Sequence, residues 1–325
     1  MKRRDFLKAA GSSAVVAGAA ATGTAEARPN LKPPANAVAM LYDSTLCTGC
    51  KACVNTCKQV NDMPVDITTQ DTLWDAAHDI GEKTLNVIKV YKHGTAEVKD
   101  RAENGYAFVK DHCKHCVDAG CVSVCPVTAM RKHPETGIVT HHADNCIGCR
   151  YCVYACPYNV PKYELSKAKG QIQKCQFCNQ KGVERIDKGM LPGCVEVCPT
   201  GASLFGTREE ILAEAKRRLA LKPGELYNYQ RGNVVDQSHT HEKAAPEYDQ
   251  HIFGEKEGGG TQVLVISGVP YQKLGLPELP ERSFASRSEG VQHTIYQGMI
   301  APGVVLAGLM YAAHRASKTH GDDES

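Results

Sequence analysis

The chain has 325 residues, of which 42% are hydrophobic, so it is long enough to bury a core of its own. Its formal net charge is only +2. The first 27 residues hold four basic and two acidic side chains and account for that excess, which leaves the remainder near neutral. No basic surplus is present to neutralise phosphates, and this excludes a nucleic-acid partner.

The first 27 residues have the pattern of a twin-arginine signal peptide. The pair Arg3-Arg4 precedes an apolar, alanine-rich stretch, and Ala25-Glu26-Ala27 forms a cleavage motif. An ordinary secretory signal is the alternative, because adjacent arginines are common. The twin-arginine route suits a protein that takes up its cofactors before export.

Sixteen cysteines fall into four groups of four. The groups are Cys47, Cys50, Cys53, Cys57; Cys113, Cys116, Cys121, Cys125; Cys146, Cys149, Cys152, Cys156; and Cys175, Cys178, Cys194, Cys198. Groups one and three have the C-x2-C-x2-C-x3-C spacing of bacterial ferredoxins. A cubane cluster takes one thiolate per iron, so the sequence predicts four [4Fe–4S] clusters with all sixteen cysteines as iron ligands.

Disulfides and zinc are the alternatives for these cysteines. Disulfide frameworks are typical of short chains that lack a core. Zinc sites use two C-x-x-C pairs or cysteine–histidine mixtures and do not require a closing Cys-Pro. Here a proline follows the closing cysteine three times, as Pro126, Pro157 and Pro199. A zinc-binding structural protein stays as a remote alternative.

The spacing of the groups predicts two ferredoxin-like double-cluster units, one nested in the other. Groups two and three are close together and form an inserted unit over residues 106–164, which begins with a strand at 106–109. Groups one and four form the outer unit from residues 38–105 and 165–206, which closes with a strand at 203–205. The expected fold class is α+β.

An extension of helix, loop and strand follows over residues 207–290. Thr207 and Glu210 have the spacing of a capping box and predict a helix start. Within that helix Glu214 lies four residues before Arg218, a favourable spacing for an ion pair. Residues 222–260 are polar and rich in turn-forming residues, and 262–266 form a short buried strand.

The C-terminal region predicts a membrane anchor. Residues 291–313 contain no Asp, Glu, Lys or Arg, so we expect a transmembrane helix over 291–314 and a cytoplasmic tail over 315–325. Gln292 and His293 favour the alternative of an amphipathic or buried helix. With the signal peptide, the anchor predicts that the protein lies at the periplasmic face of the inner membrane, in contact with the lipid bilayer.

Several cysteine segments resemble one superfamily, the four-cluster electron-transfer subunits of anaerobic respiratory enzymes. These segments are Cys113-Lys114-His115-Cys116, residues 146–152 and residues 191–199. Segments 179–185 and 254–261 are most similar to the ferredoxin-like subunits of hydrogenase-2. The resemblance covers nearly the whole chain.

The resemblance implies that cysteines from different groups share a cluster. The implied sets are Cys47, Cys50, Cys53 with Cys198; Cys175, Cys178, Cys194 with Cys57; Cys113, Cys116, Cys121 with Cys156; and Cys146, Cys149, Cys152 with Cys125. Lys174 and His115 adjoin the expected ligands Cys175 and Cys116, so they are candidates for tuning the reduction potentials of the clusters. The alternative, which is at least as favoured, is that both are ordinary surface groups.

The resemblance also implies a non-catalytic electron-transfer subunit of a hydrogenase complex. Such a subunit takes electrons from the small subunit of a periplasm-facing uptake hydrogenase and passes them to an integral membrane quinone-reducing subunit. The alternative is the iron–sulfur subunit of a formate dehydrogenase or of a sulfur-compound or dimethyl sulfoxide reductase. A signal peptide of its own weighs against formate dehydrogenase, whose cluster subunit usually travels on the signal of its partner.

Overall fold

A computed structural model describes residues 28–67, 77–167 and 169–321. Residues 30–285 form one compact unit, and the described residues 28–29 and 286–321 belong to a second. The expected signal peptide lies outside the described residues and stays a prediction.

A four-stranded mixed sheet forms the centre of the unit 30–285. Its strand order is β11-β9-β1-β13, with β1 spanning Val38–Asp43, β9 Ser203–Thr207, β11 Gly232–Asn233 and β13 Val263–Ile266. β1 pairs antiparallel with β9 and parallel with β13, which places Leu41 opposite both Leu204 and Leu264. Every residue of β13 is buried. The strands expected around residues 203–205 and 262–266 are therefore confirmed.

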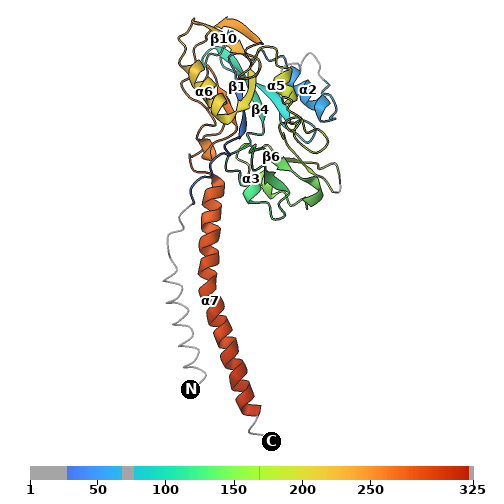
Figure 1. Cartoon of the computed structure of the whole chain (residues 1–325), viewed down its shortest axis with the longest axis vertical. Helices are drawn as coiled ribbons and strands as arrows, with labels where there is room; N and C mark the ends of the chain where they lie inside the picture. Colours follow the sequence, from blue (N-terminus) through green and yellow to red (C-terminus); the bar gives the residue numbers. More distant parts are fainter. Residues whose placement is uncertain (1–27, 68–76, 168, 322–325) are drawn as a thin grey trace. The chain divides into compact units, whose positions relative to one another are not determined.

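Helix α6, Arg208–Leu219, packs on this sheet (Figure 1). Thr207 and Glu210 form the predicted capping box, with the Glu210 amide 3.3 Å from Thr207 Oγ1. Ile211 and Ala215 lie four residues apart on one face and are completely buried in the same apolar cluster as Leu41. The helix thus packs against β1, which lies about 170 residues earlier in the chain.

The other strands form small antiparallel or mixed sheets. One three-stranded sheet has the order β2-β4-β3, from Asn86–Lys92, Gly105–His112 and Val98–Lys99. The two-stranded pairs are β10 Leu226–Gln230 with β12 Thr240–Ala244, β5 Met130–Lys132 with β6 Val139–His141, and β7 Lys162–Tyr163 with β8 Ile172–Gln173. β4 contains the strand predicted at 106–109. In Figure 1, β6 and α3 lie at the end of the unit opposite β10.

Four short helices each contain the third cysteine of one cysteine group. They are α2 Ala52–Val60, α3 Gly120–Ser123, α4 Tyr151–Tyr154 and α5 Gly193–Glu196. Two 3₁₀ turns, Ala143–Asn145 and Glu257–Gly259, complete the described elements of this unit. The architecture is a mixed fold of strands and helices, and its helices α2 and α5 lie side by side (Figure 1).

The predicted C-terminal transmembrane helix is wrong. Residues Phe284–Gly321 form helix α7, which extends into the expected tail, but no helix in the described part of the chain is both long and apolar enough to cross a membrane. Gln292, His293 and Thr294 put polar groups into the expected span, and such groups are costly in hydrocarbon. The localisation and the bilayer contact that depended on this anchor are corrected with it.

Candidate metal centres

The first and third cysteine groups begin with the same loop conformation. Gly49 and Gly148 both have φ +71°, and the residues before α2 and α4, Lys51 and Arg150, also have positive φ. A Cβ atom at Gly49 would lie 2.3 Å from a ring carbon of Phe108, so no larger residue fits there. Glycine is required at this position for both the backbone angle and the space.

Cysteines from the two ends of the cysteine-rich region meet at one cavity. Its lining includes Cys47, Cys50, Cys53 and Cys198, which we name the Cys47 quartet. Cys50 is exposed, whereas Cys47 is buried and accepts a hydrogen bond from the Gly49 amide to its Sγ at 3.4 Å. Burial is the main reason that the pKa of Cys53 rises to about 12.

A second cavity is lined by the cysteines that we name the Cys146 quartet, namely Cys125, Cys146, Cys149 and Cys152. Burial is the main reason that the pKa of Cys152 rises to about 11, and the other three thiols of this quartet contribute to that rise. Cys149 is exposed, and the Met130 amide donates to Cys125 Sγ at 3.4 Å. Amide donors to sulfur, as in both cavities, are typical of cluster ligands.

The remaining eight cysteines form two quartets that are more deeply buried. Burial raises the pKa of Cys57 well above its ordinary value, with further contributions from its neighbours Cys175, Cys194 and Cys178. Burial does the same to the pKa of Cys116, with contributions from Cys121, Cys113 and Cys156. We name these sets the Cys57 quartet and the Cys113 quartet. These groupings follow the sets that the resemblance implied, and their role as cluster ligands stays a prediction.

Neighbouring quartets also lie close to one another. Besides burial, the main cause, Cys194 raises the pKa of Cys53 and thereby links the Cys47 and Cys57 quartets. In the same way Cys113 raises the pKa of Cys175, which links the Cys57 and Cys113 quartets. Cys152 raises the pKa of Cys121 and links the Cys113 and Cys146 quartets. These contributions connect the quartets one after another in that order.

The donor chemistry of the four sites fits iron–sulfur clusters. Each site offers four thiols, which is one per iron of a cubane. Burial raises the pKa of several of these thiols, Cys53 and Cys152 among them, so metal binding there must displace their protons. When bound, the clusters supply one-electron oxidation and reduction.

Two buried lysines lie among these cysteines. Burial alone would lower the pKa of Lys110, but Cys194, Cys53 and Cys198 outweigh burial and raise it. Lys174 lies 3.9 Å from Cys113 Sγ. Sequence analysis did not identify Lys110, which is buried in β4. The only indication of its burial in the sequence was its place two residues after Phe108, on the same face of the strand.

His115 is a buried neutral group rather than a surface group. Its Nδ1 accepts a hydrogen bond from the Val139 amide at 3.1 Å, and its ring stacks on Phe177 with centroids 3.9 Å apart. Burial and then the charge of Lys174 hold its pKa well below the ordinary value. The position beside Cys116 was visible in the sequence, whereas the burial was not.

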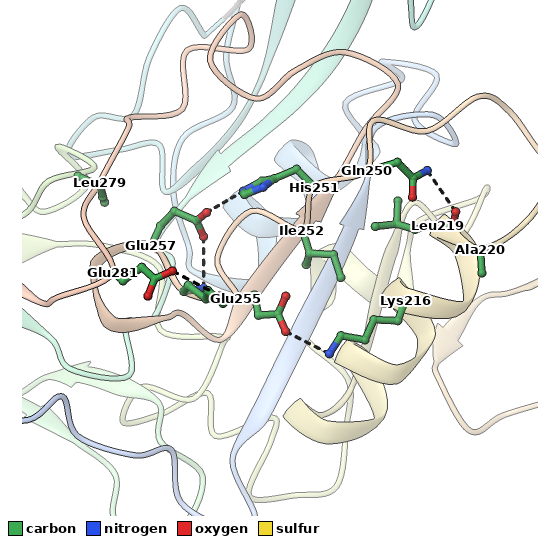
Figure 2. Close-up of a pocket in the computed structure, with 11 residues that line it drawn as sticks. Lys216, Leu219, Ala220, Gln250, His251, Ile252, Glu255, Glu257, Leu279 and Glu281 are labelled. Carbon is green, nitrogen blue, oxygen red and sulfur yellow. Dashed lines mark hydrogen bonds and ion pairs between the residues drawn. The ribbon is translucent and has the colours of Figure 1, made fainter.

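A larger cavity of about 560 Å³ lies between α6 and the chain before α7, and no cysteine lines it. Figure 2 shows His251 directed at Glu257 and Lys216 directed at Glu255. The first pair is separated by 2.7 Å and the second by 3.1 Å. These pairs balance part of the charge of the cavity, which is separate from the cysteine sites.

Comparison with known proteins identifies the family. Residues 105–208 match the family described as a 4Fe-4S dicluster domain. The chain is also 52% identical over 323 residues to the hydrogenase-2 operon protein HybA of Escherichia coli O157:H7, across 99% of this chain and 98% of the relative. The chain belongs to the HybA family. The HybA protein of Shigella flexneri shows the same identity and coverage.

The formate dehydrogenase subunits among the relatives are more distant and cover less of the chain. The iron–sulfur subunit of the nitrate-inducible formate dehydrogenase of Escherichia coli (strain K12) is 34% identical over 247 residues, which covers 75% of this chain and 74% of the relative. The predicted resemblance to hydrogenase-2 subunits and the predicted [4Fe–4S] cofactors are confirmed.

Proposed function

We propose that the chain is the electron-transfer subunit of a hydrogenase complex and relays electrons from a hydrogenase small subunit toward a membrane quinone-reducing subunit. The observation that carries this proposal is the connected series of four cysteine quartets in a HybA family member. A series of neighbouring one-electron sites can pass electrons stepwise from one end to the other. The relative is by name a hydrogenase-2 operon protein.

The ligand sets that we propose are the four quartets. Their support is the grouping of the thiols around two cavities and two buried positions. The Cys113 and Cys146 quartets draw only on the second and third cysteine groups, whereas the other two draw on the first and fourth. This division supports a nested arrangement, with residues 106–164 inserted into the outer unit.

The two ends of the series are the places where electrons can enter and leave. Cys50 of the Cys47 quartet and Cys149 of the Cys146 quartet are exposed, and they belong to the two terminal quartets. The protein's own contribution is to hold the ligands, exclude water from the inner quartets and set the charge around them. The proposal gives the chain no catalytic step of its own.

A formate dehydrogenase or a sulfur-compound or dimethyl sulfoxide reductase is the alternative catalytic partner. The similarity to the formate dehydrogenase subunit covers 75% of this chain, whereas the similarity to HybA covers 99%. The higher identity and fuller coverage therefore favour the hydrogenase.

Reduction by hydrogen tests the proposal. The loaded chain, mixed with its cognate hydrogenase under hydrogen, is expected to lose its visible iron–sulfur absorption within the time of the hydrogenase assay. Formate with a formate dehydrogenase is the control and is expected to give much slower bleaching. Fast bleaching with formate and none with hydrogen would contradict the choice of partner.

A further inference from the structure

We propose that Lys110 and Lys174 are positive charges built into the first two junctions of the series, and that each raises the reduction potential of the clusters on both sides of it. The inference rests on the proposed ligand sets. It assigns these two lysines a positioning role toward the electron-transfer reaction, since neither is an iron ligand.

Lys110 lies at the junction of the Cys47 and Cys57 quartets. It is on β4, and only 1% of its surface is exposed. Its neighbours Cys53 and Cys198 belong to the first quartet and Cys194 to the second. The ammonium donates to Ser203 Oγ at 2.9 Å, and Met40 Sδ lies 3.7 Å away. These contacts hold the charge in place but do not neutralise it.

Lys174 lies at the junction of the Cys57 and Cys113 quartets. It directly precedes Cys175, is 2% exposed, and places its ammonium 3.9 Å from Cys113 Sγ. The ammonium donates to the carbonyl oxygens of Cys175, at 3.0 Å, and of Val139. Lys174 thus contacts one residue of each adjoining quartet.

Within the described part of the chain, neither lysine forms an ion pair with a carboxylate. Other buried lysines do: Lys58 is 2.7 Å from Asp66, and Lys114 is 3.5 Å from Asp111. A buried charge without a counter-charge is costly. Such a charge is consistent with counter-charge from a ligand, and a cluster bound by four thiolates supplies negative charge at this position.

The sign of the effect follows from charge. Reduction adds one negative charge to a cluster, and a nearby ammonium in a low-dielectric site stabilises that added charge. Removing the ammonium therefore favours the oxidised form and lowers the potential. We expect a change of about tenfold in the reduction equilibrium, or ~59 mV for a one-electron couple.

The test is a potentiometric titration of the loaded chain with chemical mediators, followed by electron paramagnetic resonance. Lys110→Met is expected to lower two potentials, those of the Cys47 and Cys57 quartets, and Lys174→Met those of the Cys57 and Cys113 quartets. Lys110→Arg keeps the positive charge, so its two potentials are expected to stay close to those of the unsubstituted chain. The control is Lys89→Met on β2, because Lys89 is already paired with Asp79 and Asp111.

Unchanged potentials in variants that retain all four clusters would overturn the inference, as would an equal shift of all four. If Lys110→Met loses clusters, Lys110→Gln retains a hydrogen-bonding group toward Ser203 and is titrated instead. Cluster loss in every neutral variant, with retention in Lys110→Arg, would show a structural role and also overturn it. Because mediators replace the hydrogenase, these results are independent of which enzyme donates the electrons.

Discussion

Arg218 is a completely buried cation between two buried carboxylates. Its Nε donates to Glu214 Oε1 at 2.8 Å and its terminal nitrogen to Asp43 Oδ2 at 3.0 Å, while Tyr248 donates to the same Asp43 oxygen at 2.8 Å. The spacing in the sequence predicted the pair with Glu214. The spacing did not indicate that the pair is buried. It also gave no sign of Asp43, because Asp43 lies 175 residues earlier in the chain.

Replacing Arg218 by methionine is expected to destabilise the protein strongly. Asp43 and Glu214 would lose the buried cation between them, which leaves Glu214 with only the exposed Arg217 as a cationic partner, at a cost of about 3–5 kcal/mol. The thermal midpoint of the loaded chain should fall by on the order of 10 °C. The matched control is Arg217→Ala, because the Arg217 side chain is 55% exposed and its pair with Glu214 should contribute about 1 kcal/mol or less. Equal midpoints for the two variants would contradict this account.

Cys57→Ser tests the exchange of ligands between cysteine groups. Cys57 follows Cys53 on helix α2, but its neighbours are Cys175, Cys178 and Cys194. The variant should therefore lose the cluster of the Cys57 quartet. Its electron paramagnetic resonance spectrum should match that of Cys175→Ser and differ from that of Cys50→Ser. A match with Cys50→Ser instead would show that ligands are not exchanged.

Among the elements, the cysteine loops depend on small residues at defined places. The loop before α2 approaches β4 so closely that Gly49 lies against the ring of Phe108. The sequence favoured a glycine turn here, and the positive φ agrees. The approach of Phe108 depends on a strand from another part of the chain, so the sequence pattern alone carried no sign of it.

Gly49→Ala is therefore expected to damage one site. Its Cβ would displace Phe108 and distort the loop that holds Cys47 and Cys50, which should remove about a quarter of the iron, since one cluster of four is lost. Gly224→Ala is the control for backbone strain alone, because Gly224 has φ +89° but nothing within 4 Å of the added Cβ. Iron content per chain measures both, and full loading of Gly49→Ala would refute the steric argument.

Among the helices and strands, those predicted from local sequence patterns are present, whereas the anchor predicted from composition was wrong. The capping box at Thr207 and the buried strand before Ser267 depend on neighbouring residues, and both are present. The anchor at residues 291–314 was inferred from the absence of charge, but among the described residues no helix is long and apolar enough to span a membrane. Absence of charge does not make a segment apolar, because Gln292 and His293 are uncharged but polar.

At the scale of the whole molecule, the sixteen cysteines were enough to predict the cofactor and the number of sites. Spacing along the chain grouped them, but it could not order the quartets in space or place charges between them. The order depends on contacts between quartets, such as Cys53 with Cys194. The sequence does not place Lys110 beside the clusters. In the structure, strand β4 brings it next to Cys53 of the first cysteine group and to Cys194 and Cys198 of the fourth.

The metal and sulfide content of the purified chain tests the central claim most directly. Four [4Fe–4S] clusters require about 16 iron and 16 acid-labile sulfide per chain, with a brown colour that dithionite bleaches. The account predicts that composition, together with electron paramagnetic resonance signals of interacting reduced clusters. Zinc in the cysteine sites, with no acid-labile sulfide, would contradict it.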